Sequence, residues 1–256
     1  MQIRQTRRAS PDRIVLWGAP GIGKSTFASK FPRPIFIDCE DGIRAIDGNS
    51  FGVCTRFSDV AEQLKYLVDN PGLCDTVIID SVSEVERFIA DGLCQANNWK
   101  DLTTPGFGNG FEALRGAFLK LLAMLQQVNN AGYTVVVLAR EAMTSVADAD
   151  VGKDYVQMGP AMHKKCVEPL TGWADFVLAV RRPVILGAQA KGAGQKQFAA
   201  AIQDAVIYTT TTAGHIAKAR FPMPAQLEFS YAAWQTARQS AATTTTNATQ
   251  NETNNA

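Results

Sequence analysis

Continuous runs of apolar residues alternate along this chain with segments in which apolar residues recur every three or four positions. The continuous runs predict buried strands, because a strand that is covered on both faces has no polar side. The runs lie at residues 14–17, 34–38, 52–57, 76–80, 133–139, 175–180 and 205–209.

Helices are predicted between several of these runs. The apolar residues of 59–68 and of 111–128 fall on a single stripe, which is typical of a helix with one buried face. Ser81 followed by Glu84 is typical of a capping box and predicts a third helix that runs toward Cys94. Together the elements predict an α/β fold, a mainly parallel sheet with helices on both faces, which binds ligands at the carboxyl ends of its strands.

The two ends of the chain break this pattern. Residues 1–13 are basic, with arginine at positions 4, 7, 8 and 13, and we expect a short flexible arm. The core is expected to span residues 14–229. Residues 230–256 are expected to be mostly disordered, because from Gln239 onward the segment has too few apolar residues to offset the entropy of ordering.

Three internal stretches are expected to be loops. Residues 99–110 contain the sequence TTPGFGNG, residues 141–162 are polar and mixed, and residues 187–195 are small and include Lys191. Each stretch lacks the apolar pattern of the segments around it.

The composition narrows the class of protein. The chain has 256 residues, 46% of them apolar, so it can bury one good core, and its net charge of +1 neither requires nor excludes nucleic acid. Its five cysteines form no CxxC pair and are expected to be reduced. No apolar run approaches the ~20 residues that span a bilayer, and the N-terminus lacks a secretion signal, so we expect a cytoplasmic protein with no membrane partner.

The most specific motif is GAPGIGKS at residues 18–25, which has the spacing of a phosphate-binding loop. In such a loop backbone N–H groups surround phosphate oxygens, Lys24 adds a charge for the β and γ phosphates, and the Ser25 hydroxyl is a ligand for Mg²⁺. An apolar strand before the loop and a predicted helix at 25–30 support the match. The residues expected to bind ATP are Gly18, Ala19, Pro20, Gly21, Ile22, Gly23, Lys24, Ser25 and Thr26.

Two acidic positions complete the expected catalytic site. Asp80 ends the apolar run 76–80 and is expected to hold Mg²⁺, directly or through water; the alternative is that it only caps the next helix. Asp38 and Glu40 follow the second strand, and we expect Glu40 to orient the attacking water and accept its proton. Asp38 could instead hydrogen-bond the turn at Gly42.

These motifs resemble a known family. A phosphate loop, a strand leading into FIDCEDG and a strand ending in VIIDS look like the RecA-type recombination ATPases. The chain is more closely similar to the short phage RecA-like ATPases that accompany single-strand annealing and recombination genes. The similarity covers about residues 13–220 and includes GFGNG, the segment 154–175 and AKARF at 217–221.

The resemblance implies a RecA-like P-loop NTPase core and a Mg²⁺-dependent, DNA-stimulated ATPase, in the host cytoplasm if a phage encodes it. Glu40 matches the water-activating glutamate of the family. Lys218 and Arg220 match basic residues that reach the nucleotide of a neighbouring subunit in a ring or filament, and could otherwise be exposed charges at a strand end. Where the family usually has a polar sensor, this chain has Arg140 and Glu141. Arg140 could report loss of the γ phosphate, or the two residues could form an internal salt bridge.

Single-stranded DNA is the partner that the resemblance implies, together with single-strand binding or annealing proteins. The corresponding loops are 100–110 and 141–165, although aspartates in the second loop largely cancel its positive charge. The expected DNA contacts are Phe107, Lys153, His163, Lys164 and Lys165.

Two other functions use the same loop. A nucleotide-gated loader or partner-recruiting switch would keep Lys24 and Asp80 but hydrolyse ATP slowly. A small-molecule kinase would need an arginine-rich lid, for which Arg181 and Arg182 are the only adjacent pair after the core begins.

Overall fold

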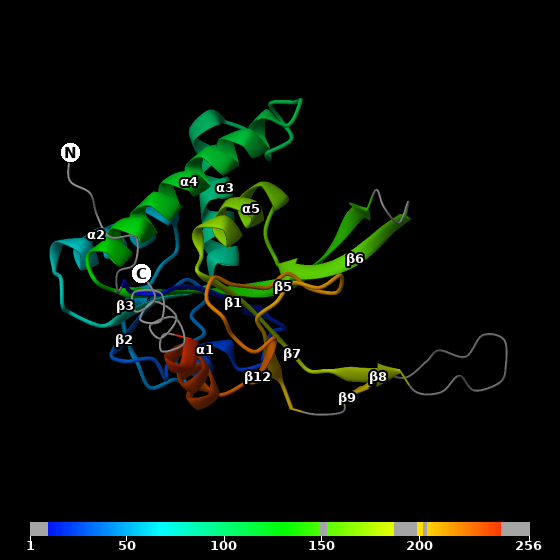
Figure 1. The fold of residues 1–256 in the computed structure, drawn as a ribbon. Helices are drawn as coiled ribbons and strands as arrows, with labels where there is room; N and C mark the ends of the chain where they lie inside the picture. Colours follow the sequence, from blue (N-terminus) through cyan, green and yellow to red (C-terminus); the bar gives the residue numbers. More distant parts are fainter. Residues whose placement is uncertain (1–9, 149–152, 187–198, 202–203, 242–256) are drawn as a thin grey trace, which may run out of the picture.

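The computed structural model describes residues 10–148, 153–186, 199–201 and 204–241, and it confirms the α/β fold. Most strands belong to one sheet in the order β12-β10-β7-β1-β5-β4-β2-β3, in which β7 through β3 run parallel (Figure 1). These parallel strands are β1 (Arg13–Gly18), β2 (Pro34–Asp38), β3 (Asn49–Val53), β4 (Thr76–Asp80), β5 (Thr134–Asp148) and β7 (Phe176–Arg181).

Short antiparallel strands extend the sheet beyond β7. β10 pairs with β7 and β12, and β11 pairs with the start of β7. β6 pairs with β5, and β8 and β9 form a separate hairpin. Their bounds are β6 (Lys153–Pro160), β8 (Val184–Leu186), β9 (Ala199–Ala201), β10 (Val206–Tyr208), β11 (Lys218–Ala219) and β12 (Gln226–Glu228).

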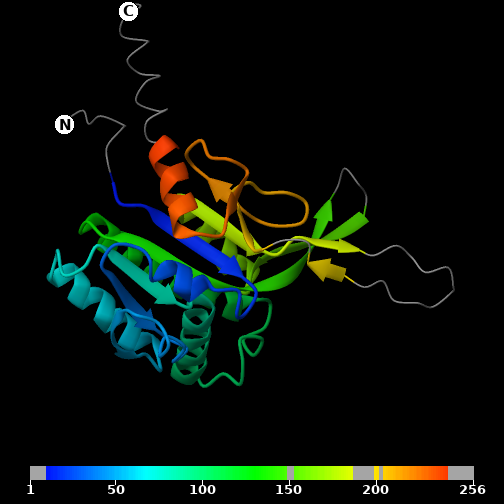
Figure 2. The same cartoon turned by 90° about the horizontal axis from the view of Figure 1, so that it is seen from below.

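Helices cover both faces of the sheet. On one face lie α2 (Phe57–Asp69), α3 (Val82–Asn97), α4 (Asn109–Asn130) and α5 (Lys164–Trp173), which bury the larger apolar cluster. The other face carries α1 (Lys24–Ala28) and a helix at 231–241 (Figure 2). Within these described stretches, no helix combines the length and hydropathy needed to cross a bilayer.

Described residues on both sides of the expected core at 14–229 pack against it. Arg13 begins β1, and Asp12 forms an ion pair with Arg238 of the helix at 231–241. Trp234 of that helix is 3% exposed and packs edge-on against Phe176. The packed core therefore continues past the expected boundary at residue 229, while residues 1–9 and 242–256 lie outside the described residues.

Two internal predictions need correction. The strand expected at 52–57 is β3 at Asn49–Val53, and Phe57 already belongs to α2. The loop expected over 141–162 is mostly the long hairpin of β5 and β6, whose cross-strand register is continuous from Glu141 and Pro160 outward. The small-residue stretch 187–195 lies outside the described residues.

Candidate nucleotide site

The phosphate loop leaves the carboxyl end of β1 and bends back into α1. Gly23, immediately before α1, has a φ of 107°, a conformation that favours glycine. Gly18 is required for a different reason, because a Cβ there would lie 2.5 Å from the carbonyl oxygen of Val180 on β7. Gly21 has a φ of 72° and open space around its Cα. The loop is thus held by backbone rotation at two positions and by close strand packing at a third.

Lys24 lies within the curve of the loop. Its ammonium group donates hydrogen bonds to the carbonyl oxygens of Gly18 (2.8 Å) and Ala19 (3.0 Å). Burial lowers the pKa of Lys24, whereas the nearby charges of Asp80 and Glu40 act in the opposite direction. The predicted phosphate-binding cation therefore sits beside the predicted carboxylates.

Ser25 and Asp80 meet directly. The Ser25 hydroxyl donates to Oδ2 of Asp80 at 2.5 Å, and Asp80 is 8% exposed. Burial raises the pKa of Asp80, and the hydrogen bond from Ser25 partly opposes this. One hydroxyl and one carboxylate are hard oxygen ligands of the kind that Mg²⁺ uses together with nucleotide phosphates, so these residues fit the expected ion.

The alternation of side chains along the strands brings the other polar residues to the same face. Ile78 of β4 and Leu138 of β5 point into the apolar cluster that also contains Phe27 of α1. Two positions further along each strand, Asp80 and Arg140 therefore point to the α1 side.

Glu40 and Arg140 form an ion pair at the edge of this face. Arg140 Nη2 lies 3.0 Å from Glu40 Oε2 and 3.9 Å from Glu84 Oε2. The hydrogen bond to Glu40 raises the pKa of Arg140. Arg140 therefore pairs with two glutamates on other elements, and the pairing with Glu141 considered from the sequence is not the one formed.

Ser81 and Asp38 have local roles that differ from expectation. The Ser81 hydroxyl donates to Glu40 Oε1 and does not cap α3 through its side chain, so the predicted capping box is wrong. The Asp38 carboxylate accepts from the backbone N–H of Glu40 at 3.1 Å, which supports the start of the turn. Glu40 is thus held by three neighbouring groups.

Comparison with known proteins agrees with this geometry. Residues 10–221 match the protein family described as AAA domain. The chain belongs to the AAA domain family.

One curated relative of this AAA domain protein is the SPbeta prophage-derived uncharacterized protein YorG of Bacillus subtilis (strain 168). The two are 23% identical over 170 residues, which are 64% of this chain and 49% of YorG. The match therefore spans about half the length of that relative. Family membership places the chain among P-loop nucleoside triphosphatases, which bind a nucleotide, usually with Mg²⁺.

Three of the expected DNA contacts come together at one place on this AAA domain protein. Phe107 is fully exposed and lies two residues before the start of α4. His163 stacks on Phe111 of α4 with ring centroids 4.4 Å apart, and Lys165 forms a 2.6 Å ion pair with Glu112. The two loops chosen from the sequence are therefore neighbours in space.

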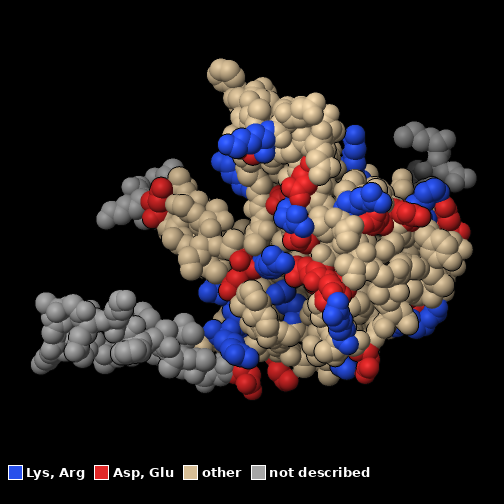
Figure 3. All heavy atoms as spheres, turned by 180° about the vertical axis from the view of Figure 1, so that it is seen from behind, with Lys and Arg blue, Asp and Glu red and all other residues tan. Residues whose placement is uncertain are grey.

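The remaining expected contacts are placed differently. Lys164 is exposed at the start of α5. Lys153 opens β6 opposite Asp148, seven register pairs along the hairpin from Glu141, and so lies apart from the loops around Phe107. Seen from behind, basic side chains lie interspersed with acidic ones (Figure 3), consistent with the near-neutral net charge.

Glu86 links these loops to the helix that follows Asp80. Both carboxylate oxygens of Glu86, on α3, accept from the backbone N–H of His163, at 2.9 and 3.1 Å. His163 is the N-cap of α5, and its Nδ1 accepts from the Lys165 N–H. Sequence reasoning missed Glu86, because its partner is a backbone group 77 residues away.

Lys218 and Arg220 lie at the other end of the sheet. Lys218 pairs with Val177 near the start of β7, and its ammonium group donates to the carbonyl oxygens of Thr171, Gly172 and Ala174 at the end of α5. Arg220 lies 3.1 Å from Asp175. Within one chain both residues stabilise the amino ends of the strands, and their expected action in trans stays a prediction.

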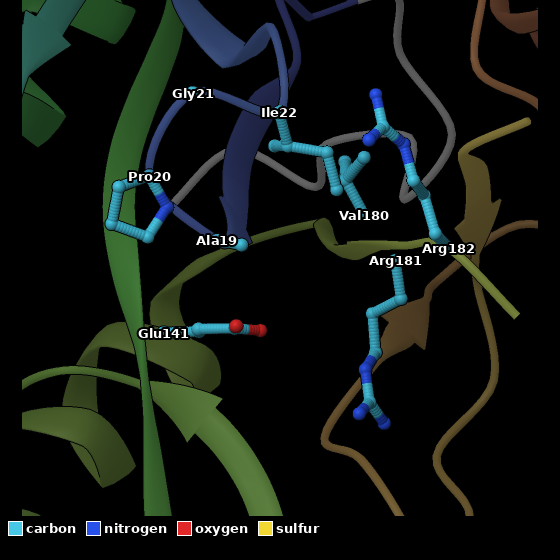
Figure 4. Close-up of a pocket in the computed structure, with 8 residues that line it drawn as sticks. All are labelled: Ala19, Pro20, Gly21, Ile22, Glu141, Val180, Arg181 and Arg182. Carbon is cyan, nitrogen blue, oxygen red and sulfur yellow. The ribbon is translucent and has the colours of Figure 1, made fainter. Parts of the chain in front are cut away.

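Three residues beside the loop were not assigned to nucleotide binding from the sequence. Glu141, Arg181 and Arg182 line a cavity together with the outer side of the loop (Figure 4). Their position along the chain could have indicated a role: Arg182 comes directly after β7, at the carboxyl ends of the strands, where such sheets bind ligands.

Proposed function

We propose that this protein hydrolyses ATP with Mg²⁺ and couples hydrolysis to the binding of single-stranded DNA and to self-assembly, in phage homologous recombination or strand annealing. The observation that carries the ATPase part is the convergence of Lys24, the Ser25–Asp80 pair and Glu40 at one strand edge. The similarity to a prophage-derived protein and to phage RecA-like ATPases supports the biological setting.

Each residue has a distinct part in this reaction. Lys24 and the loop N–H groups bind and orient the phosphates, and Ser25 and Asp80 hold the metal. Bound Mg²⁺ neutralises charge on the phosphate oxygens. Glu40 orients a water for attack on the γ phosphate and accepts its proton, while Arg140 and the Ser81 hydroxyl fix the direction of the Glu40 carboxylate.

Single-stranded DNA is proposed to bind at the loops around Phe107 and His163. An exposed aromatic ring can stack on a base, and Lys164 and Lys165 can contact phosphates. Lys153 on the β5–β6 hairpin is proposed as a more distant phosphate contact. Single-strand binding or annealing proteins are the proposed partners.

Self-assembly into a ring or filament is proposed to bring Lys218 and Arg220 to the nucleotide of a neighbour. Such a contact would require Lys218 to exchange its three carbonyl acceptors on α5 for the neighbour's phosphate. Arg220, whose side chain is 48% exposed, would have to exchange only its ion pair with Asp175.

A second function, a nucleotide-gated loader or recruiting switch, is favoured by one specific contact. The 3.0 Å ion pair with Arg140 occupies one carboxylate oxygen of Glu40 and the Ser81 hydroxyl occupies the other, so neither oxygen is left free to accept a proton from a water. A protein that keeps this pair throughout its cycle would bind ATP and hydrolyse it slowly.

ATP turnover with and without a single-stranded oligonucleotide tests these functions. The recombination function predicts turnover that the oligonucleotide stimulates, and the switch predicts slow turnover in both conditions. Glu40→Gln should bind ATP normally and lose at least about 100-fold in turnover, because general-base catalysis contributes roughly this much or more. Preserved turnover in this variant would remove Glu40 from its role.

A further inference from the structure

A cavity runs along the outer side of the phosphate loop. One wall is formed by the loop residues Ala19 to Ile22. The others are formed by Glu141 of β5, by Val180 and Arg181 at the end of β7, and by Arg182 after it (Figure 4). It lies directly against the loop but on a different side from Asp80 and Glu40, so none of the groups assigned above to the metal or to water activation lines it.

The direction of a bound nucleotide follows from the groups already placed. The terminal phosphate must lie near Asp80, which ends β4, and near Glu40, which follows β2 by two residues. In the sheet these strands are on the β5 side of β1, and β7 is on the other side. A polyphosphate that points its terminal group toward β4 and β2 therefore directs its nucleoside toward the end of β7, where this cavity lies.

The lining of the cavity suits a flat aromatic base. Ile22 and Val180 present apolar side chains, and the Arg182 side chain extends beside them (Figure 4). A guanidinium group is planar, keeps its charge at all relevant pH values and stacks on aromatic rings. The apolar side chains of Ile22 and Val180 would add no binding energy for a phosphate group.

Arg181 and Arg182 differ although they are adjacent. Arg181 points away from the loop, with its Nη1 3.5 Å from the carbonyl oxygen of Gly214. Arg182 is exposed, lies on the α1 side by strand alternation, and forms no ion pair with any residue in the described ranges. Arg182 is therefore available to a ligand, and Arg181 is a matched control one residue away.

We propose that this cavity is the nucleoside subsite of the protein, and that Arg182 binds the base by stacking its guanidinium on the ring. The inference rests on the proposed nucleotide function and adds the part of the site that recognises the base. It does not depend on DNA binding or on assembly.

Calorimetric titration of the full chain with MgATP and with magnesium tripolyphosphate tests the subsite. Arg182→Ala should weaken ATP binding by about 3- to 30-fold, the range expected for one cation–aromatic contact, and leave tripolyphosphate binding unchanged. Arg182→Lys, which keeps the charge but loses the planar group that stacks on the base, should recover only part of this loss. Arg181→Ala, which removes a cavity-lining side chain that points away from the loop toward Gly214, should weaken ATP binding clearly less than Arg182→Ala does.

The possible failures are distinguishable. Equal ATP binding by wild type and Arg182→Ala overturns the subsite and leaves the nucleotide function intact. Wild-type affinity in Arg182→Lys, or an equal loss for tripolyphosphate in Arg182→Ala, shows a phosphate contact and also overturns it. If the wild type binds neither ligand, the nucleotide function itself fails, and the subsite fails with it. Unchanged thermal unfolding of the variants confirms that they are folded.

Discussion

The two ends of the parallel strands carry similar charged residues but use them differently. At the amino end, Asp175 accepts three hydrogen bonds from Arg13 and pairs with Arg220. At the carboxyl end, Lys24 is held by loop carbonyl oxygens, and Arg182 lies beside a cavity. The charges at the amino end pair with one another far from the phosphate loop, whereas those at the carboxyl end gather around the loop, where the proposed nucleotide would bind. If the proposed nucleotide site is correct, the position of a charged residue along its strand indicates its role better than the residue type does.

The largest expected effect of a single substitution is at the carboxyl end. Lys24→Ala should reduce ATP binding and turnover by at least about 100-fold, because the phosphate loop loses its charge for the β and γ phosphates. Titration calorimetry and a phosphate-release assay measure the two effects. Thermal unfolding should change little, and a variant that still turned over ATP would contradict the assignment of the loop.

The helix at 231–241 should give the next largest effect, on stability. Trp234 is 3% exposed and contacts Phe176 at the base of β7, so Trp234→Ala should lower the free energy of unfolding by about 3–5 kcal/mol. Urea denaturation measures this loss. A change below about 1 kcal/mol would show that the helix does not belong to the packed core.

Asp175→Asn should cost about 2 kcal/mol of stability, because it leaves Arg13 with one neutral acceptor in place of a carboxylate. Burial alone raises the pKa of Asp175, but the hydrogen bonds and charge of Arg13 hold it below its ordinary value. The stabilising pair is present above the ordinary carboxyl pKa and is lost as pH falls through the lowered value. Denaturation at several pH values should show this loss in wild type and not in Asp175→Asn, while ATP binding stays unchanged in both.

The smallest expected effect concerns Glu86. Burial raises its pKa, with the Cys166 thiol and the His163 N–H acting in the opposite direction. The folded state therefore holds a proton longer than the unfolded state, and this contribution to stability falls as pH rises above the ordinary carboxyl range. Glu86→Gln should remove that slope, with a difference of about 1 kcal/mol or less at neutral pH. Identical pH profiles of unfolding for the two proteins would contradict this.

Much of the fold could be predicted because its strands are continuous apolar runs. The run before Asp80 and the loop motif before Lys24 both required buried parallel strands; these strands, β4 and β1, both pair with β5, which brings Ser25 to Asp80. The β5–β6 hairpin was missed because both of its faces carry polar residues, with Met143 and Val156 exposed among them. Exposed strands of this kind lack the one-sided pattern that identifies a strand.

Other features depend on contacts that no local pattern reveals. The helix at 231–241 is rich in alanine and glutamine, and its stability comes from a few buried residues such as Trp234. Lys218 was expected to reach the nucleotide of a neighbouring subunit; within its own chain β11 pairs with the start of β7 and carries it to the amino end of the sheet. The strand with which a two-residue strand pairs depends on how the chain before it folds back, and no local sequence pattern predicts this.

The glycines of the phosphate loop are not interchangeable, and the reason differs between them. At position 21 there is room for a side chain and only the positive φ is demanding, so asparagine, which tolerates that rotation, is a conceivable substitute. At position 18 a backbone oxygen of β7 occupies the place of any Cβ, and no choice of side chain on Val180 would move it. The glycine at position 21 is thus explained by a backbone torsion angle, and the glycine at position 18 by the short distance between two strands.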